Sequence, residues 1–166
     1  MYPALTIASQ FINRGIAEGN PVTPMKLQKL IYFAHGLHLA RHQQPLIREP
    51  VQAWTYGPVI PDIYYQFKRW GNNPITTPIT FSIGDDGELV SGPAPLDAEA
   101  QATVNMTWDI TKDFNAIQLS NWTHEQGSPW FQAVSMNDTG ITEREPIDNE
   151  LIKDYFTEII RNDVGE

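Results

Sequence analysis

The sequence contains no cysteine. Disulfide bonds, thiolate metal sites and cysteine nucleophiles are therefore all excluded. No stretch approaches the roughly 18 uninterrupted apolar residues that a membrane helix needs, so we expect no membrane contact. The first residues lack a basic segment followed by a long apolar run, and no secretory signal is expected. Together these absences predict a cytoplasmic protein.

Basic residues are scarce. Lysine and arginine number 11 against 20 aspartates and glutamates, which gives a formal net charge of −9. Residues 1–75 hold seven basic and three acidic side chains, whereas residues 76–166 hold four and seventeen. A chain this acidic repels phosphate backbones, so direct binding to nucleic acid is not expected. The charge favours a basic protein partner, although acidity that only keeps the protein soluble remains an open alternative.

Apolar residues are plentiful enough for a core. The chain has 166 residues, 41% of them hydrophobic and 11% aromatic, which suits one domain spanning residues 1–166. The spacing of apolar residues, with capping and proline signals, predicts helices over 5–17, 24–42, 61–70, 97–112, 116–123 and 148–161, with a short one after Ser128-Pro129. The β signals are a short strand over 51–56, ended by Gly57-Pro58, and a hairpin over 81–90. The predicted fold class is mainly α: a compact single domain of six or seven helices with a minor β-hairpin or short strands.

Three histidines lie close to one face of the predicted 24–42 helix. His35, His38 and His42 occupy positions i, i+3 and i+7. Metal ligation needs imidazoles at fixed geometry, usually completed by a carboxylate. The helix contains no aspartate or glutamate, so we interpret the histidines as a polar rim beside the buried stripe. No metal site and no cofactor are predicted.

A serine, a histidine and an acid gather between Thr123 and Trp130, which allows a hydrolase built on His124 and Ser128. Nucleophilic catalysis requires a serine at a sharp exposed turn with an oxyanion hole. No Gly-x-Ser-x-Gly motif surrounds Ser128. We therefore expect Ser128 to cap a helix and the chain not to be an enzyme, with the hydrolase kept as an alternative.

Aromatic and cationic residues concentrate between positions 54 and 70. Tyrosine, tryptophan and arginine dominate the hot spots of protein interfaces, because they bury a large area while keeping a polar group. We expect Trp54 and Trp70 to be buried, and Tyr56, Tyr65 and Arg69 to lie at the surface. The predicted partner-binding residues are Trp54, Tyr56, Tyr64, Tyr65, Lys68, Arg69 and Trp70.

Three stretches, taken in order, resemble a known family. They are Lys26-Leu27-Gln28-Lys29-Leu30-Ile31-Tyr32-Phe33-Ala34; then Ala53-Trp54-Thr55-Tyr56-Gly57-Pro58-Val59-Ile60-Pro61 with Tyr64 and Phe67-Lys68; and then Leu119-Ser120 with Thr123-His124 and Ser128-Pro129-Trp130. In order and spacing they are similar to the Panacea domain of SocA-like antitoxins. The resemblance covers roughly residues 4–160. It implies a compact helical domain that acts as the antitoxin of a bacterial or prophage toxin–antitoxin pair.

The resemblance also implies how such a protein works. Family members neutralise a protein toxin, commonly by direct binding, and at least one type is an adaptor that presents its toxin to a protease. A cognate toxin and a AAA+ protease are therefore the expected partners. The family has no established catalytic residues, so none is carried over to this chain. A phage-encoded adaptor whose main partner is a protease or a host regulator remains an alternative.

Overall fold

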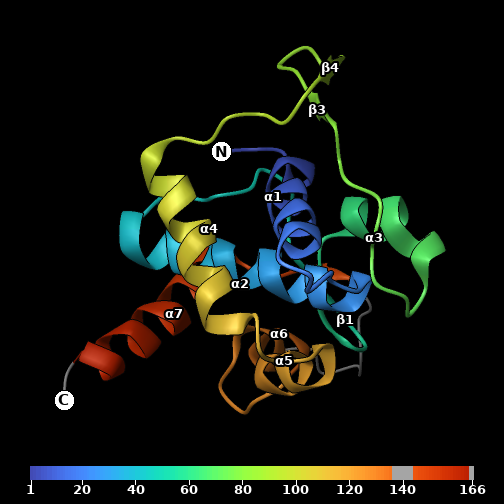
Figure 1. The fold of residues 1–166 in the computed structure, drawn as a ribbon. Helices are drawn as coiled ribbons and strands as arrows, with labels where there is room; N and C mark the ends of the chain where they lie inside the picture. The colour runs from blue at the N-terminus through green and yellow to red at the C-terminus, as the bar shows by residue number, and fades with distance from the viewer. Residues whose placement is uncertain (136–143, 165–166) are drawn as a thin grey trace.

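The computed structural model describes residues 1–135 and 144–164 (Figure 1), and it confirms the mainly α fold. The helices are α1 (Ala4–Ala17), α2 (Pro24–His42), α3 (Pro61–Phe67), α4 (Ala98–Thr111), α5 (Ala116–Thr123), α6 (Pro129–Ser135) and α7 (Asn149–Val164), with the 3-10 turn η1 (Lys68–Trp70) continuing α3. The strands are β1 (Gln52–Trp54), β2 (Gly57–Val59), β3 (Phe81–Ile83), β4 (Leu89–Ser91) and β5 (Glu145–Pro146). Within the described ranges, no helix has both the length and the apolar character needed to cross a bilayer.

Helix α2 lies at the centre of the fold, with α1, α4, α5 and α7 packed around it (Figure 1). It begins as predicted: the Thr23 hydroxyl accepts a hydrogen bond from the Lys26 amide, and Pro24 occupies the first helical position. It ends where Gln43 adopts a left-handed conformation with φ 58°. Every residue from 26 to 39 is buried, so α2 is enclosed on all sides.

Close contact between α2 and α7 depends on Gly36. A Cβ atom at this position would overlap the ring of Phe156 on α7. The rings of Tyr32 and Phe33 pack edge-on against the same Phe156 ring, with centroids 5.6 and 5.8 Å away. Gly36 therefore allows the two helices to approach and an aromatic cluster to form between them.

Capping side chains begin two further helices where the sequence predicts them. The Asp97 carboxylate accepts a 2.8 Å hydrogen bond from the Ala100 amide at the start of α4. The Asp148 carboxylate accepts a 2.9 Å bond from the Glu150 amide at the start of α7. Both contacts satisfy amides that have no partner within the helix. Helix α7 continues to Val164, beyond the predicted end at residue 161.

The β1–β2 hairpin corrects one prediction. The strand expected over 51–56 is shorter, the turn falls at Thr55-Tyr56, and Gly57–Val59 forms a second strand where we expected only a turn. Two features permit this pairing. Gly57 adopts φ 115°, which glycine tolerates, and Pro58 lies in an edge strand, where a missing N–H is accepted. Strand β5 pairs with the other side of β1, so the order is β2-β1-β5.

The predicted hairpin over residues 81–90 is confirmed. Strand β3 pairs with β4 in antiparallel register from Phe81↔Ser91 to Ile83↔Leu89. The hairpin extends away from the helices at the top of Figure 1. It takes no part in the pocket described below.

Candidate partner-binding site

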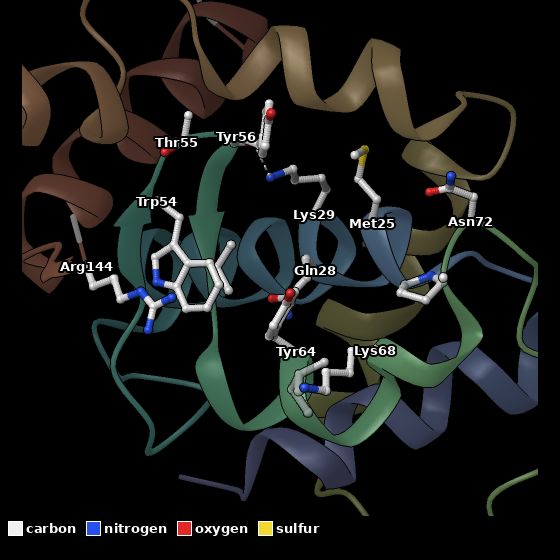
Figure 2. Close-up of a pocket in the computed structure, with 14 residues that line it drawn as sticks. Met25, Gln28, Lys29, Trp54, Thr55, Tyr56, Tyr64, Lys68, Asn72 and Arg144 are labelled. Carbon is white, nitrogen blue, oxygen red and sulfur yellow. Dashed lines mark hydrogen bonds between the residues drawn. The ribbon is translucent and has the colours of Figure 1, made fainter. Parts of the chain in front are cut away.

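An open pocket of about 480 Å³ lies between the first half of α2, the β1–β2 turn and α3 (Figure 2). Its lining combines segments that are far apart in the sequence. The lining residues are Pro24, Met25, Gln28, Lys29, Trp54, Thr55, Tyr56, Val59, Ile63, Tyr64, Lys68, Gly71, Asn72 and Arg144. We call this the aromatic pocket, because Trp54, Tyr56 and Tyr64 contribute their side chains to it (Figure 2).

Four of the seven predicted partner-binding residues line the aromatic pocket, namely Trp54, Tyr56, Tyr64 and Lys68. The rings of Trp54 and Tyr64 pack edge to face, with centroids 5.0 Å apart. The other three predicted residues, Tyr65, Arg69 and Trp70, lie outside its lining. The structure therefore divides the predicted surface into a pocket and a flank.

The predicted exposure of Tyr56 and Tyr65 is confirmed, whereas the predicted burial of the two tryptophans is only partly observed. Tyr56 is 75% exposed and Tyr65 54% exposed, and Tyr64 is 42% exposed. Trp54 and Trp70 are half-buried, with Trp70 packed against the core. Three large aromatic side chains thus face solvent within one short segment. Single apolar residues scattered over a surface are common, but a cluster of this kind is typical of a binding site.

The backbone beneath the pocket is fixed by a side chain of α2. The Gln28 amide accepts a 2.8 Å hydrogen bond from the Ile60 N–H and donates a 3.1 Å bond to the Ile60 carbonyl. Gln28 is buried, so both bonds satisfy groups that are shielded from water. They join α2 to the residue immediately before α3 and so fix the position from which α3 starts.

Lys29 holds the β1–β2 hairpin from inside. Its Nζ donates hydrogen bonds to the carbonyls of Tyr56 and Pro58, at 3.1 and 3.3 Å. Burial lowers the pKa of Lys29 from 10.5 to about 8, because desolvation disfavours the charged ammonium. A Cβ atom at Gly57 would lie 2.7 Å from this Nζ, so the close approach requires glycine there. Sequence reasoning assigned Lys29 no role, since a lysine in a helical pattern carries no signal for burial.

Arg144 is the other cation that sequence reasoning missed. Its guanidinium lies over the Trp54 ring, 4.4 Å from the centroid, a cation–π contact. It also lies 3.5 Å from the Tyr65 hydroxyl. Arg144 comes immediately before β5, and the pairing of β5 with β1 brings it to the pocket. No local sequence signal could have found it.

The three histidines of α2 have separate partners. His35 Nε2 lies 2.9 Å from Asn149 Oδ1, and His38 Nδ1 lies 2.9 Å from the Thr103 hydroxyl. His42 Nδ1 lies 3.5 Å from a carboxylate oxygen of Glu99. The described residues contain no group of three or more metal-ligating side chains. The predicted polar rim is wrong for His35 and His38, which are buried because α2 is enclosed on all sides, and only His42 is partly exposed. The absence of a metal remains a prediction.

Ser128 and His124 are both engaged in structural hydrogen bonds. The Ser128 hydroxyl donates to the Thr123 carbonyl at 2.8 Å and accepts from the Phe131 amide at 3.1 Å, which caps α6 as predicted. Ser128 is 1% exposed, unlike a nucleophile at an exposed turn. His124 Nδ1 lies 2.6 Å from the Ser120 carbonyl, and its ring packs edge-on against Trp130. The arrangement gives the hydrolase alternative no support.

The comparisons with known proteins agree with this architecture. Residues 27–131 match the sequence model of the family described as antitoxin SocA-like, Panacea domain. The chain is also 29% identical over 156 residues to Antitoxin SocA of Caulobacter vibrioides (strain NA1000 / CB15N), covering 92% of this chain and 81% of that protein. No solved structure shows a significant match. The family match spans most of α2, the β1–β2 hairpin, α3 and the Ser128 cap, and the chain therefore belongs to the SocA-like antitoxin family with its Panacea domain.

Proposed function

We propose that this protein is the antitoxin of a bacterial or prophage toxin–antitoxin pair and that it neutralises a cognate protein toxin by direct, stoichiometric binding. Membership of the SocA-like antitoxin family supports the biological role. The observation that carries the mode of action is the exposure of Tyr56 and Tyr64 in one open pocket and of Tyr65 beside Tyr64. Exposed aromatic residues beside cations are the composition of an interface hot spot.

The pocket is suited to binding because its parts are already held in place. Gln28 fixes the backbone at Ile60, and Lys29 fixes the carbonyls of the β1–β2 turn. The indole of Trp130 donates a 2.7 Å hydrogen bond to the Trp54 carbonyl. A surface whose backbone is held in place before binding loses less conformational entropy when a partner arrives. We therefore expect the area buried in the aromatic pocket to give a higher affinity than the same area on a mobile surface.

The net charge adds a long-range electrostatic attraction to the contacts made in the pocket. The chain carries −9 at pH 7, so a basic toxin would be attracted at a distance and would associate faster at low salt. Such steering changes the association rate more than the choice of partner. The choice of partner would then depend on the contacts made in the aromatic pocket.

The test is co-expression with the product of the adjacent gene, followed by titration of that protein's toxic activity with purified antitoxin. Stoichiometric binding predicts that inhibition is complete near one antitoxin per toxin, with a complex of fixed mass. Inhibition at far below equimolar antitoxin would indicate turnover and would overturn the proposal.

A matched pair of substitutions tests the site. Tyr64→Ala removes a pocket residue that is 42% exposed, and Phe114→Ala removes an aromatic residue that is 41% exposed on the segment after α4. We expect Tyr64→Ala to weaken toxin binding by about 1–4 kcal/mol and Phe114→Ala to leave it nearly unchanged. Equal effects of the two substitutions would argue against the aromatic pocket as the binding site.

A further inference from the structure

The aromatic pocket carries charge of one sign. Lys29, Lys68 and Arg144 line it, and among the residues that the structure describes no aspartate or glutamate belongs to the lining. The chain as a whole has 20 acidic and 11 basic side chains, so the pocket has the opposite charge to the protein around it. A concave surface lined by one sign of charge concentrates its electric field in the opening. The field of this pocket attracts an anion.

The three cations also lack an acidic partner among the described residues. The ion pairs found among the described residues engage other cations away from the pocket, namely Arg14, His42, Lys153 and Arg161. The Lys29 ammonium is buried, and its acceptors within residues 1–135 and 144–164 are the neutral carbonyls of Tyr56 and Pro58. A buried charge without a counter-charge is costly, and its lowered pKa reflects that cost. An anion bound nearby would reduce the cost of burying the ammonium.

The two outer cations are held in position by aromatic rings. Arg144 lies over Trp54 at 4.4 Å, and the Lys68 Nζ lies 5.7 Å from the centroid of the Tyr65 ring. In Figure 2 Arg144 lies beside Trp54 and Lys68 lies near Tyr64, so the two aromatic side chains stand between the two cations. The pocket therefore places an apolar aromatic surface between two exposed positive charges.

We propose that the aromatic pocket receives an acidic segment of the partner protein, in which an aspartate or glutamate side chain lies next to an apolar one. The carboxylate is attracted by Lys29, Lys68 and Arg144, and the apolar neighbour packs against Trp54 and Tyr64. A volume of about 480 Å³ is suited to a short segment rather than to a whole helix. This inference rests on the proposed function, since it names the chemistry of the toxin segment that enters the site. The inference also predicts something that the net charge does not: a toxin that is basic as a whole would place an acidic side chain in the aromatic pocket.

Three small probes of the same shape test the charge preference on the full chain: 3-phenylpropanoate, 3-phenylpropanamide and 3-phenylpropylammonium. NMR titration of the lysine side chains and tryptophan indoles follows their binding. We expect the carboxylate to bind about tenfold tighter than the amide, the difference of a charge-assisted contact, and the ammonium to bind weakest. The carboxylate should also raise the pKa of Lys29 above its value of about 8 in the free protein. Equal binding of carboxylate and amide would overturn the proposal, as would displacement of the carboxylate by equimolar inorganic phosphate.

Neighbouring cations provide the matched control. Lys68 lines the pocket, whereas Arg69 is exposed but lies outside the lining. The Lys68→Gln substitution should lower the preference for carboxylate over amide several-fold, and combining it with Arg144→Gln should remove most of it. Arg69→Gln should leave the preference unchanged. A preference that survives the double substitution would contradict the assignment.

The two proposals can fail separately. If Tyr64→Ala weakens toxin binding but the probes show no charge preference, the pocket binds the toxin and the acidic segment is wrong. If the probes discriminate by charge but Tyr64→Ala leaves neutralisation unchanged, the anion preference stands and the proposed toxin site is wrong.

Discussion

The indole Nε1 of Trp130 donates a 2.7 Å hydrogen bond to the backbone carbonyl of Trp54, a residue 76 positions earlier in the chain. This bond joins α6 to strand β1 immediately before the turn that carries Tyr56. The His124 ring packs edge-on against the same indole, with centroids 4.2 Å apart. Trp130 is therefore a positioning residue for the aromatic pocket, although it does not line it.

Replacing Trp130 with phenylalanine tests this role. Trp130→Phe keeps an aromatic ring but removes the N–H, so the Trp54 carbonyl loses its partner. We expect the free energy of unfolding to fall by about 1–2 kcal/mol and toxin affinity to fall several-fold, since the β1–β2 turn becomes less ordered. Urea unfolding and a binding titration measure the two effects. Phe131→Leu, an exposed change on the same helix, should alter neither quantity.

Gly36→Ala should destabilise the protein, although alanine is ordinarily the better helix former. A Cβ atom there would overlap the Phe156 ring, and we expect a loss of about 1–3 kcal/mol from overpacking. Phe156→Leu also destabilises by itself, because it removes buried aromatic surface. The double variant should lose less than the sum of the single losses, since the smaller side chain makes room for the new methyl group. Strict additivity in urea unfolding would contradict this account.

Ser128→Ala should lower the free energy of unfolding by about 0.5–2 kcal/mol, through loss of the α6 cap. Toxin binding should remain nearly intact. Ser135→Ala, an exposed change at the end of the same helix, is the control and should fall within about 0.5 kcal/mol of the parent. A Ser128→Ala protein with normal stability and no activity would revive the hydrolase alternative.

Stability should fall as the pH is lowered through the range in which free histidine titrates. His35 Nδ1 accepts from the amides of Leu46 and Ile47, at 3.3 and 3.4 Å, so Nε2 carries the proton that bonds Asn149. Burial lowers the pKa of His35 below its ordinary value of 6.5. Burial, followed by the charge of His42, lowers the pKa of His38 as well. The unfolded chain therefore binds protons first, and stability that is complete above pH 6.5 is lost as the pH falls towards the folded-state pKa values.

The free energy of unfolding can change with pH by at most about 1.4 kcal/mol per pH unit for each proton taken up on unfolding. Urea unfolding between pH 7.5 and 5 should show the decline, and His35→Gln should make it shallower while lowering stability at pH 7.5. An unchanged slope in His35→Gln would show that His35 does not contribute.

The helical framework could be predicted from the sequence because its signals are local. The Thr23-Pro24 start of α2, the Asp97 cap of α4 and the Ser128 cap of α6 each involve residues within one helical turn. Part of the aromatic exposure between positions 54 and 70 could be predicted from position. Tyr64 and Tyr65 are adjacent on one helix and cannot point the same way, and the structure exposes both. Strand β2 was missed because Gly57-Pro58 signals a turn unless an edge position is available in a sheet.

Only the tertiary structure determined the aromatic pocket. In the sequence Lys29 is one lysine within a helical pattern. Its role in holding the β1–β2 hairpin depends on backbone carbonyls 27 and 29 residues further along the chain. Arg144 is 79 positions from Tyr65, and the β5–β1 pairing brings the two side chains together. Local spacing determines which residues form a helix and which of its faces is apolar. The charge inside a cavity depends on segments that meet only when the chain is packed, and that information is not local.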